Sequence, residues 1–371
     1  NQLKYIISLF ICFSFLVQGQ TIDPLKVDLS NQYAQKKWVD SVYKSLSLNE
    51  KVGQLFMPMV FSEKDSLHYF QTLKLVKEQK VGGLIFSRGG PLEQSHWLND
   101  FQAQSKTPLL IAMDAEWGVA MRLDSVKPFP WSMTLGAVND SLLLRKIGQR
   151  MAEQEKRLGI HYSFGPVLDI NTNPNNPIIG NRSFGASKER VSRQALAIMR
   201  GHHDFGILTS GKHFPGHGDT ALDSHKTLPT IELSSKRIKS IELEPYNRLI
   251  DAGLSSVMVA HLSVPSLTKK GLPTSLSKDI IQKILIDEIG FKGLIVTDAL
   301  NMKGVSEYYK VKNIDLAAFK AGNDLLLISN DIPEGIRAIT EAIEREEITE
   351  ARLANSVKKI LKAKYKVGLS N

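Results

Sequence analysis

From residue 52 onward the chain repeats one pattern: a short apolar run, a polar turn, and an amphipathic stretch of roughly 12 to 20 residues. Apolar runs with the length of buried strands cover residues 54–60, 83–86, 109–113, 162–168, 207–210, 256–260, 294–297 and 324–328. Helix-like stretches cover residues 64–80, 92–106, 140–158, 188–205, 236–252, 277–290, 312–321, 332–346 and 349–367. Alternating strands and helices pair their strands in parallel, and eight such units close into a barrel. The pattern therefore predicts an α/β protein with a single (β/α)8 TIM barrel.

The alternative is a doubly wound open sheet. No glycine-rich phosphate loop of the kind common in such sheets follows any of the predicted strands, which favours the barrel. Residues 20–48 are expected to form a polar lead-in segment with a first helix over residues 33–46, and residues 49–371 to form the barrel domain.

The first residues have the pattern of a secretory signal peptide. Lys4 precedes an apolar run over residues 5–17, and Gly19 offers a small residue for cleavage. The run is short for a membrane anchor, so we expect residues 1–19 to be removed and the protein to be periplasmic or extracellular. Cys12, the single cysteine, lies inside this segment, which leaves the mature chain without a disulfide or a thiol nucleophile.

The charge pattern points to no macromolecular partner. The formal net charge of +9 comes from 47 basic and 38 acidic residues that are spread along the chain without an arginine-rich block. No nucleic-acid motif accompanies them, so we expect no nucleic-acid binding. A mild preference for an anionic polymer such as cell wall is the alternative to ordinary surface lysines. We expect a monomer with no stable membrane insertion.

Ionisable residues recur where the predicted strands end. The residues at these ends are Asp114, Asp169, Lys212, His213, His261 and Asp298. Each alone is more often a helix cap or part of a buried ion pair, but their recurrence at one structural position favours a shared site. Asp298 follows the apolar strand 293–297 without a neighbouring counter-charge, which suits a nucleophile, a metal ligand or an N-cap.

The segment 212–225, KHFPGHGDTALDSH, is the part of the chain richest in proton-handling groups. Its Pro and Gly residues predict an irregular loop after a strand near residues 206–209. His225 lies two residues after Asp223, whose carboxylate would orient the imidazole for proton transfer. Residues alone favour a structural role for His213 and His217 in the tight turn.

A metal site is the alternative use of this segment. His213 and His217 have the spacing of a helical zinc pair, but the intervening Phe-Pro-Gly excludes that helix. We therefore expect no metal and no organic cofactor, and a metal-dependent hydrolase is the least favoured interpretation.

These residues resemble the β-N-acetylglucosaminidase branch of glycoside hydrolase family 3. The segment KHFPGHGDTALDSH is similar to the signature KHFPGHG-x-x-x-x-DSH at every fixed position. Further segments agree in order and spacing: DAEWGVAMRL at 114–123, GPVLDINTNPNNPIIGNRSFG at 165–185, MVAHLSVP at 258–265 and VTDALNMKG at 296–304. The resemblance runs from about residue 48 to residue 367.

The resemblance implies roles position by position. Asp298 would be the nucleophile, and His225 the acid/base assisted by Asp223. The residues that would bind the terminal sugar are Asp114, Arg122, Arg182, Lys212 and His213. The implied activity is that of an exported retaining exo-β-N-acetylglucosaminidase, which removes terminal N-acetylglucosamine from cell-wall muropeptides or chitin oligosaccharides.

Two features bear on what the resemblance implies. Many relatives carry Gln-Glu-Gly-Gly where this chain has Ala115-Glu116-Trp117-Gly118, so Trp117 would reshape the region beyond the terminal sugar. Larger relatives have a second α/β sandwich domain or continue into another hydrolase domain. The rival functions are a β-N-acetylglucosaminide or β-glucoside phosphorylase that uses the same Asp and His residues, and a non-catalytic wall-binding module.

Overall fold

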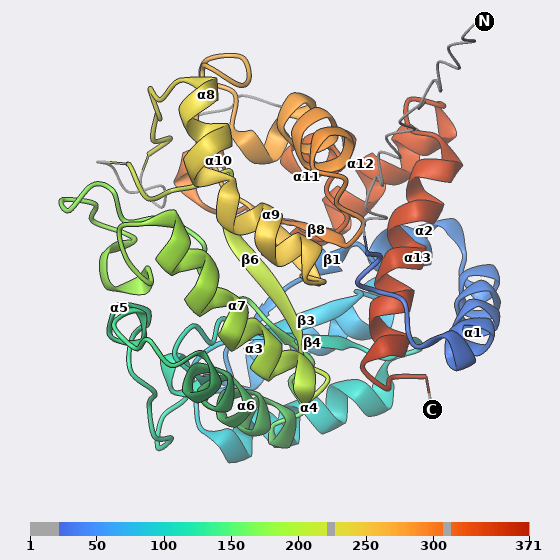
Figure 1. Ribbon diagram of the computed structural model, residues 1–371. Helices are drawn as coiled ribbons and strands as arrows, with labels where there is room; N and C mark the ends of the chain where they lie inside the picture. The colour runs from blue at the N-terminus through green and yellow to red at the C-terminus, as the bar shows by residue number, and fades with distance from the viewer. Residues whose placement is uncertain (1–21, 221–226, 307–312, 371) are drawn as a thin grey trace, which may run out of the picture.

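The computed structural model describes residues 22–220, 227–306 and 313–370. Its centre is a curled sheet of parallel strands surrounded by helices (Figure 1). The strands follow one another in chain order: β2 (Met59–Val60), β3 (Gly83–Phe86), β4 (Leu110–Met113), β5 (Tyr162–Ser163), β6 (Leu208–Phe214), β7 (Ser256–Val259) and β8 (Leu294–Thr297). Sequential order places every crossover on one face of the sheet. The alternative of a doubly wound open sheet is therefore wrong.

Two more strands form a separate parallel pair. Strand β1 (Phe56–Met57) pairs in parallel with β9 (Leu326–Leu327), and Pro58 separates β1 from β2. Proline has no N–H to donate to a strand ladder, which accounts for the interruption of the strand predicted over residues 54–60. An isolated parallel bridge between Val296 and Leu325 connects β8 with the segment that leads into β9.

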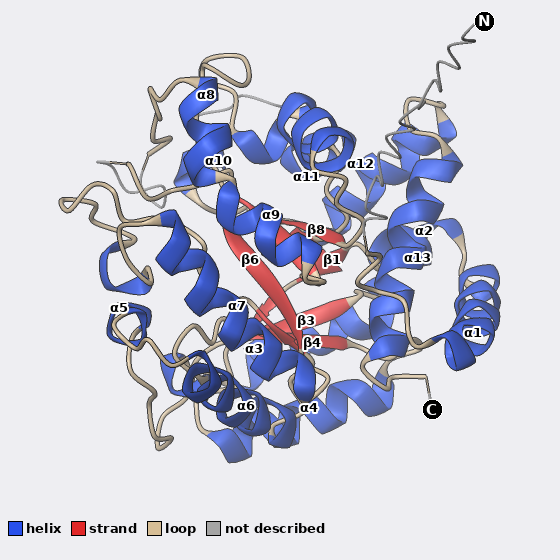
Figure 2. Cartoon of the chain, viewed as in Figure 1, coloured by secondary structure: helices blue, strands red, loops and turns tan. Residues whose placement is uncertain are grey.

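The helices cover the outer face of the strands (Figure 2). The α-helices are α1 (Gln32–Ser45), α2 (Leu48–Gly53), α3 (Ser66–Lys74), α4 (Pro91–Gln104), α5 (Ser132–Gly136), α6 (Ser141–Arg157), α7 (Lys188–Asp204), α8 (Ser235–Arg237), α9 (Glu244–Asp251), α10 (Lys303–Ser306), α11 (Ile314–Ala321), α12 (Ile332–Glu344) and α13 (Glu350–Lys366). The longer helices of other types are η2 (Leu75–Gln79), η5 (Ile238–Glu242) and η7 (Asp279–Glu288). The predicted alternation of strand and helix is thus confirmed.

Three strands differ most in length from those predicted, and one of them, β9, covers only Leu326–Leu327 of the run predicted over residues 324–328. Strand β5 ends at Ser163, although the apolar run continues to Leu168, because Gly165 and Pro166 follow and a proline cannot donate to the ladder. Strand β6 continues to Phe214, although the prediction ended it at Ser210. Its last residues are all buried, so the strand includes the polar side chains of Lys212 and His213 because both find buried partners.

The helix predicted over residues 236–252 is divided into α8, η5 and α9. Pro245 lies in the first turn of α9, where the missing N–H is tolerated, and this position fixes a new helix start. The stretch predicted over residues 277–290 begins at Asp279 and is a π-helix. The start of the helix predicted at residue 312 lies outside the described residues.

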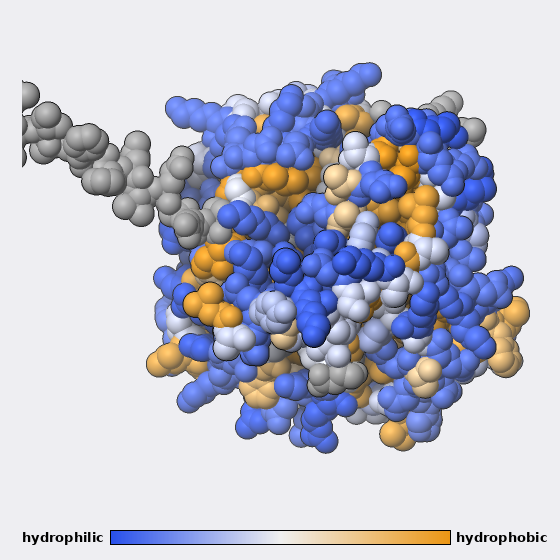
Figure 3. Space-filling view, turned by 90° about the vertical axis from the view of Figure 1, so that its right-hand side faces the viewer, coloured by the Kyte–Doolittle hydropathy of each residue, from blue (hydrophilic) through white to orange (hydrophobic). Residues whose placement is uncertain are grey.

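The lead-in segment packs on the last helix. Gln35 of α1 donates from Nε2 to the carbonyl oxygens of Leu25, at 2.8 Å, and Lys362, at 3.3 Å. Figure 3 shows the side of the molecule on which α1 and α13 lie in Figure 1, and hydrophilic residues cover most of it, with smaller apolar areas between them. Within the described ranges, no helix has both the length and the apolar character that a membrane crossing needs.

Candidate active site

A cavity of about 400 Å³ lies at the C-terminal ends of the strands. Its polar wall combines carboxylates and cations that come from loops far apart in the sequence. These charged residues are Asp114, Glu116, Arg122, Arg182, Lys212 and Asp298, and His213 and His217 lie beside them. Apolar side chains, among them Ile85, Phe164 and Met258, form the rest of the wall. A cavity of this size and mixed polarity fits a small polar ligand such as one sugar ring.

Asp114 follows β4 directly and connects two cations. Its Oδ1 accepts a hydrogen bond from Lys212 Nζ at 2.8 Å, and its Oδ2 accepts one from Arg122 Nη2 at 2.7 Å. Burial by itself would raise the pKa of Asp114, but the Lys212 ammonium and the Arg122 guanidinium outweigh it and hold the pKa at about 2. Asp114 is therefore a fixed anion at any physiological pH.

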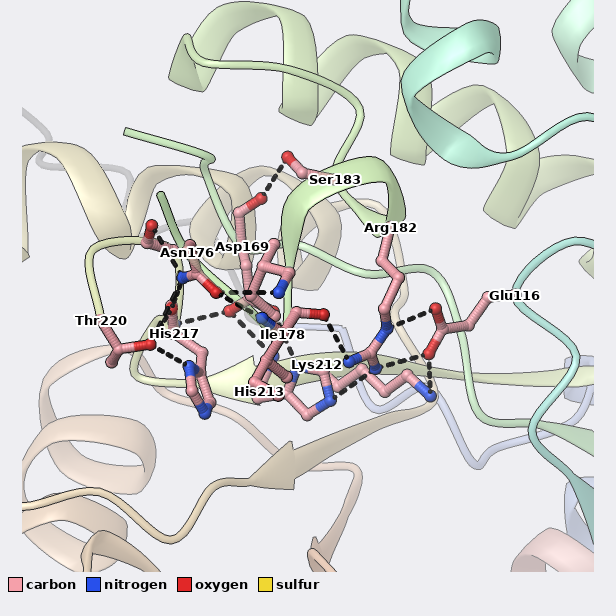
Figure 4. A network of polar contacts seen from close by, with 12 residues as sticks. Glu116, Asp169, Asn176, Ile178, Arg182, Ser183, Lys212, His213, His217 and Thr220 are labelled. Carbon is pink, nitrogen blue, oxygen red and sulfur yellow. Dashed lines mark hydrogen bonds and ion pairs between the residues drawn. The ribbon is translucent and has the colours of Figure 1, made fainter. Parts of the chain in front are cut away.

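Glu116 is the second carboxylate of this network (Figure 4). It accepts from Arg182 Nε at 2.9 Å and from Arg182 Nη2 at 2.7 Å, a bidentate pair, and its Oε1 lies 2.8 Å from Lys212 Nζ. Its side chain is only 1% exposed. Burial opposes its charge, yet Arg182 and Lys212 lower the pKa of Glu116 well below its usual range. Glu116 thus fixes the positions of both cations at the cavity wall.

Asp169 accepts hydrogen bonds from both His213 and His217. It is completely buried, accepts from His213 Nδ1 at 2.6 Å, and accepts from the backbone N–H of His217 at 2.7 Å. His213 Nε2 lies 3.2 Å from Arg182 Nη2, and because a guanidinium can only donate, Nε2 must accept. The proton of His213 therefore resides on Nδ1, toward Asp169. Burial lowers the pKa of His217 to about 4, so that imidazole is neutral at pH 7.

Asp298 lines the same cavity and directly follows β8. Its Oδ1 accepts the backbone N–H of Ala299 at 2.8 Å, which orients the carboxylate. The side chain is half-buried. His261 lies behind this turn, fully buried, with Nδ1 2.7 Å from Ser275 Oγ and Nε2 2.9 Å from the carbonyl oxygen of Ala299. Both ring nitrogens are engaged by protein groups, so His261 supports the turn that carries Asp298.

The structure brings most of the predicted site residues to one cavity. Asp114, Arg122, Arg182, Lys212, His213 and Asp298 all line it. Asp223 and His225 lie outside the described residues. Within residues 22–220, 227–306 and 313–370, no three His, Cys, Asp or Glu side chains are grouped as metal ligands.

Three further residues belong to this site that are absent from the predicted sugar-binding residues: Glu116, Asp169 and His217. The spacing of Asp114 and Glu116 was a usable signal, because two carboxylates that flank one residue after a strand end can reach the same neighbours. Asp169 is a predicted strand-end residue, for which a helix cap or a buried ion pair is the more common role. The structure makes it the acceptor for both histidines of the following strand and turn.

Trp117 and Trp131 form a stacked aromatic pair beside this network. Their ring centroids are 4.3 Å apart and their planes differ by 11°. Neither ring lines the described cavity. Trp117, where this chain differs from many relatives, therefore contacts the segment before α5. The adjacent Glu116 still contacts Arg182 and Lys212.

Comparisons with known proteins identify the family to which this chain belongs. Residues 47–363 match the family described as Glycosyl hydrolase family 3 N terminal domain. Beta-hexosaminidase A of Pseudoalteromonas piscicida is 30% identical over 295 residues, which cover 73% of this chain and 49% of that protein. The chain thus spans about half the length of this curated relative.

Two solved structures are also similar. A glycoside hydrolase family 3 beta-N-acetylglucosaminidase from Paenibacillus sp. str. FPU-7 superposes with a TM-score of 0.82 at 36% identity, and the match covers 88% of this chain and 64% of that one. The beta-glucoside phosphorylase BglX bound to 2FGlc gives a TM-score of 0.86 at 28% identity, covering 94% of this chain and 63% of that one. Fold, charged cavity and sequence agree, and the chain belongs to glycoside hydrolase family 3 through the N-terminal domain of that family.

Proposed function

We propose that this chain is the catalytic part of a retaining exo-β-N-acetylglucosaminidase on a complete (β/α)8 barrel. Closure of the barrel is supported by hydrogen bonds on both sides of β9. Thr297 N–H donates to Leu325 O at 3.1 Å on one side, and Leu326 N–H donates to Leu55 O at 2.8 Å on the other. Residues 49–371 would form this domain, residues 20–48 its lead-in, and residues 1–19 a cleaved signal for export to the periplasm or cell surface.

The observation that carries the activity is the position of Asp298. It shares one cavity with the Asp114 and Glu116 network. Charged hydrogen-bonding groups suit the hydroxyls of a sugar, and a strand-end carboxylate in the same cavity suits attack on its anomeric carbon. Asp114, Arg122, Arg182, Lys212 and His213 would bind the terminal sugar.

In the proposed reaction an oxygen of Asp298 attacks the anomeric carbon as the bond from that carbon to the leaving oxygen breaks. His225, assisted by Asp223, gives its proton to the leaving oxygen. A water then attacks the same carbon, His225 takes a proton from that water, and the bond to Asp298 breaks. The transition states have oxocarbenium character, and the configuration is retained over two inversions. The reaction uses no metal or organic cofactor.

The test is hydrolysis of p-nitrophenyl β-N-acetylglucosaminide by the mature protein and by Asp298→Ala, with and without azide. We expect the variant to lose activity. Azide, a small nucleophile that fits the vacated space, should attack the anomeric carbon, so that p-nitrophenol leaves and an α-linked glycosyl azide forms. His225→Ala should be impaired mainly on substrates with poor leaving groups. An Asp298→Ala protein with wild-type activity would contradict the assignment.

A phosphorylase is the second candidate, and the similarity to the beta-glucoside phosphorylase BglX is the observation that favours it. An imidazole acid/base brings no fixed negative charge toward an incoming phosphate. Against it, Arg122, Arg182 and Lys212 each already have Asp114 or Glu116 as an ion-pair partner, so none of these wall cations is held ready for a phosphate alone. Turnover in phosphate and phosphate-free buffers, with analysis for a sugar 1-phosphate, separates the two reactions.

The proposed natural substrate is a cell-wall muropeptide or chitin oligosaccharide that ends in N-acetylglucosamine. The relatives named beta-hexosaminidase and beta-N-acetylglucosaminidase support this class of sugar. Release of N-acetylglucosamine, but not of glucose, from matched aryl glycosides tests it.

A further inference from the structure

The positive charge of the chain is concentrated on two helices that pack against each other. Helix α1 holds three basic residues and one acidic residue, and helix α13 holds six basic residues and one acidic residue. Trp38 of α1 contacts Tyr365 of α13, with ring centroids 5.9 Å apart. Most of the formal net charge of +9 therefore lies on this helix pair, although the sequence shows the basic residues spread along the chain.

Part of this charge is neutralised inside the protein. Lys359 Nζ lies 3.0 Å from Asp324 Oδ2, and Arg352 Nη1 lies 3.6 Å from Asp324 Oδ1. Lys364 is completely buried. The other lysines of the two helices reach the outer surface, on the side of the molecule that faces the viewer in Figure 3: Lys36, Lys37, Lys44, Lys358, Lys362 and Lys366.

Two adjoining hollows lie along this surface. The first has a volume of about 400 Å³, and its lysines come from the lead-in, α1 and α13: Lys26, Lys36, Lys358 and Lys362. The second, of about 410 Å³, continues along α1 past Lys37 and Lys44. Tyr33, Lys36 and Asp40 line both hollows, so the two form one elongated groove, here called the lysine groove. Among the described residues, none lines both this groove and the active-site cavity.

The spacing of residues along α1 builds one wall of the groove. The residues of α1 that line the second hollow recur at intervals of one, three and four, which places them on one face of the helix: Tyr33, Lys36, Lys37, Asp40, Ser41 and Lys44. A helix holds such a row of side chains at fixed separations. The lysine groove therefore presents an ordered row of cations to a ligand.

The single carboxylate that lines the groove does not neutralise these cations. Asp40 Oδ1 accepts a hydrogen bond from Lys358 Nζ at 2.7 Å, and Asp40 Oδ2 lies 3.7 Å from Lys36 Nζ. In the described part of the chain, Lys26, Lys37 and Lys44 have no carboxylate within 4.0 Å. Cations that lack a protein counter-charge favour an anionic ligand, and a row of them favours a ligand with repeated anionic groups.

Tyr33 indicates what carries the anionic groups. Its side chain is 79% exposed and lies where the two hollows join, so one ring face is available to a ligand. An aromatic ring contacts the apolar face of a sugar, while its hydroxyl can bind a sugar hydroxyl. A strand of sugars fits an elongated groove, whereas a flat membrane surface would leave the groove empty.

We propose that the lysine groove binds an anionic polysaccharide, a polymer whose sugar units carry carboxylate or phosphate groups. This polymer is not the substrate, because the groove shares no described lining residue with the active-site cavity. Binding would hold the protein on the polymer while the cavity at the strand ends stays open. The proposal does not depend on the reaction proposed above.

The experiment measures the Kd of the mature protein for fluorescently labelled polygalacturonate, a carboxylated polysaccharide, by fluorescence anisotropy at low and at physiological salt. Dextran, single-stranded DNA and phosphatidylglycerol vesicles serve as competitors. We expect the polygalacturonate complex to weaken as salt rises, because binding releases counterions. The triple variant Lys36→Gln, Lys37→Gln, Lys44→Gln should raise this Kd about tenfold, since three exposed cations are lost.

The matched control removes the same charge elsewhere. The triple variant Lys146→Gln, Lys236→Gln, Lys278→Gln changes three exposed lysines in or beside other helices and should leave the Kd nearly unchanged. Tyr33→Ala should raise the Kd for polygalacturonate about fivefold, the value of one ring contact, but not the Kd for polyphosphate, which has no sugar ring.

Several outcomes would overturn the proposal. These are no binding of polygalacturonate at low salt, equal losses in the two triple variants, or stronger competition by DNA or vesicles than by unlabelled polygalacturonate. Hydrolysis of the aryl glycoside should be unchanged in the groove variants, and a loss there would assign the groove to the active site instead. Failure of the proposed function looks different, because the wild-type protein would then cleave no aryl glycoside and still bind the polymer.

Discussion

Glu116 offers the sharpest test of how the charged network works. The change Glu116→Gln keeps the shape of the side chain and one acceptor oxygen but removes the negative charge. The carboxylate contacts both Arg182 and Lys212, and within the described part of the chain it is the sole carboxylate that Arg182 contacts within 4 Å. In the variant, Arg182 would lose this carboxylate partner, and Lys212 would keep only Asp114 of its two partners.

The magnitude follows from this burial. Removing one partner of a buried ion pair costs about 3–5 kcal/mol, because the remaining charge stays desolvated. Since glutamine retains an acceptor, we expect the free energy of unfolding to fall by about 3 kcal/mol, the lower end of this range. Arg182 and Lys212 would also lose their fixed positions, and a displacement of about 1 Å in binding groups costs on the order of 100-fold in rate. We expect a similar loss in kcat/KM for the aryl glycoside.

The assay combines equilibrium urea unfolding with steady-state kinetics. Glu153→Gln is the control, because Glu153 makes the same kind of contact, 2.6 Å to Arg150, on the exposed face of α6. An exposed pair of this kind contributes about 0–1 kcal/mol. If Glu116→Gln matched the wild type in both urea midpoint and kcat/KM, the claim that Glu116 positions the two cations would be refuted.

Two further predictions concern pH and stability. Burial lowers the pKa of Lys364 from 10.5 to about 7, and its Nζ lies 2.6 Å from Gln54 Oε1. The unfolded chain holds this proton up to higher pH, so stability should rise between about pH 7 and 10.5, and Lys364→Met should abolish that rise in urea midpoints. Burial, opposed by Arg237, raises the pKa of Glu242 from 4.5 to about 7, so stability should be full below about pH 4.5 and decline as pH rises through 7. Glu242→Gln should remove this decline, and an unaltered pH profile in either variant would contradict the corresponding assignment.

Much of the fold was predictable because it depends on local periodicity. The buried runs at Gly83–Phe86 and Leu294–Thr297 are strands at the predicted positions, since both are buried throughout and apolar except for Thr297. Strand β6 was predicted too short because Lys212 and His213 do not look like core residues. Their burial depends on partners that approach from other strands, which periodicity does not contain.

The site was predictable in part for the same reason. Strand ends point to one edge of a parallel sheet, so Asp114, Lys212 and Asp298 could be placed near one another from their positions alone. The ion pairs could not, because Lys212 and Asp114 are 98 residues apart and Arg182 and Glu116 are 66 apart. Which carboxylate meets which cation depends on loop conformations that no short segment fixes.

The sequence by itself determined the alternation of strands and helices, the ordered motifs that resemble glycoside hydrolase family 3, and the candidate residues at the strand ends. These properties reside in short segments, where spacing and side-chain type suffice. Only the tertiary structure decided that Glu116 bridges Arg182 and Lys212, that Asp169 supports His213 and His217, and that lysines of α1 and α13 line one groove. Each of these depends on contacts between segments that are far apart in the sequence. Burial then determines how strongly the charged groups in these contacts interact.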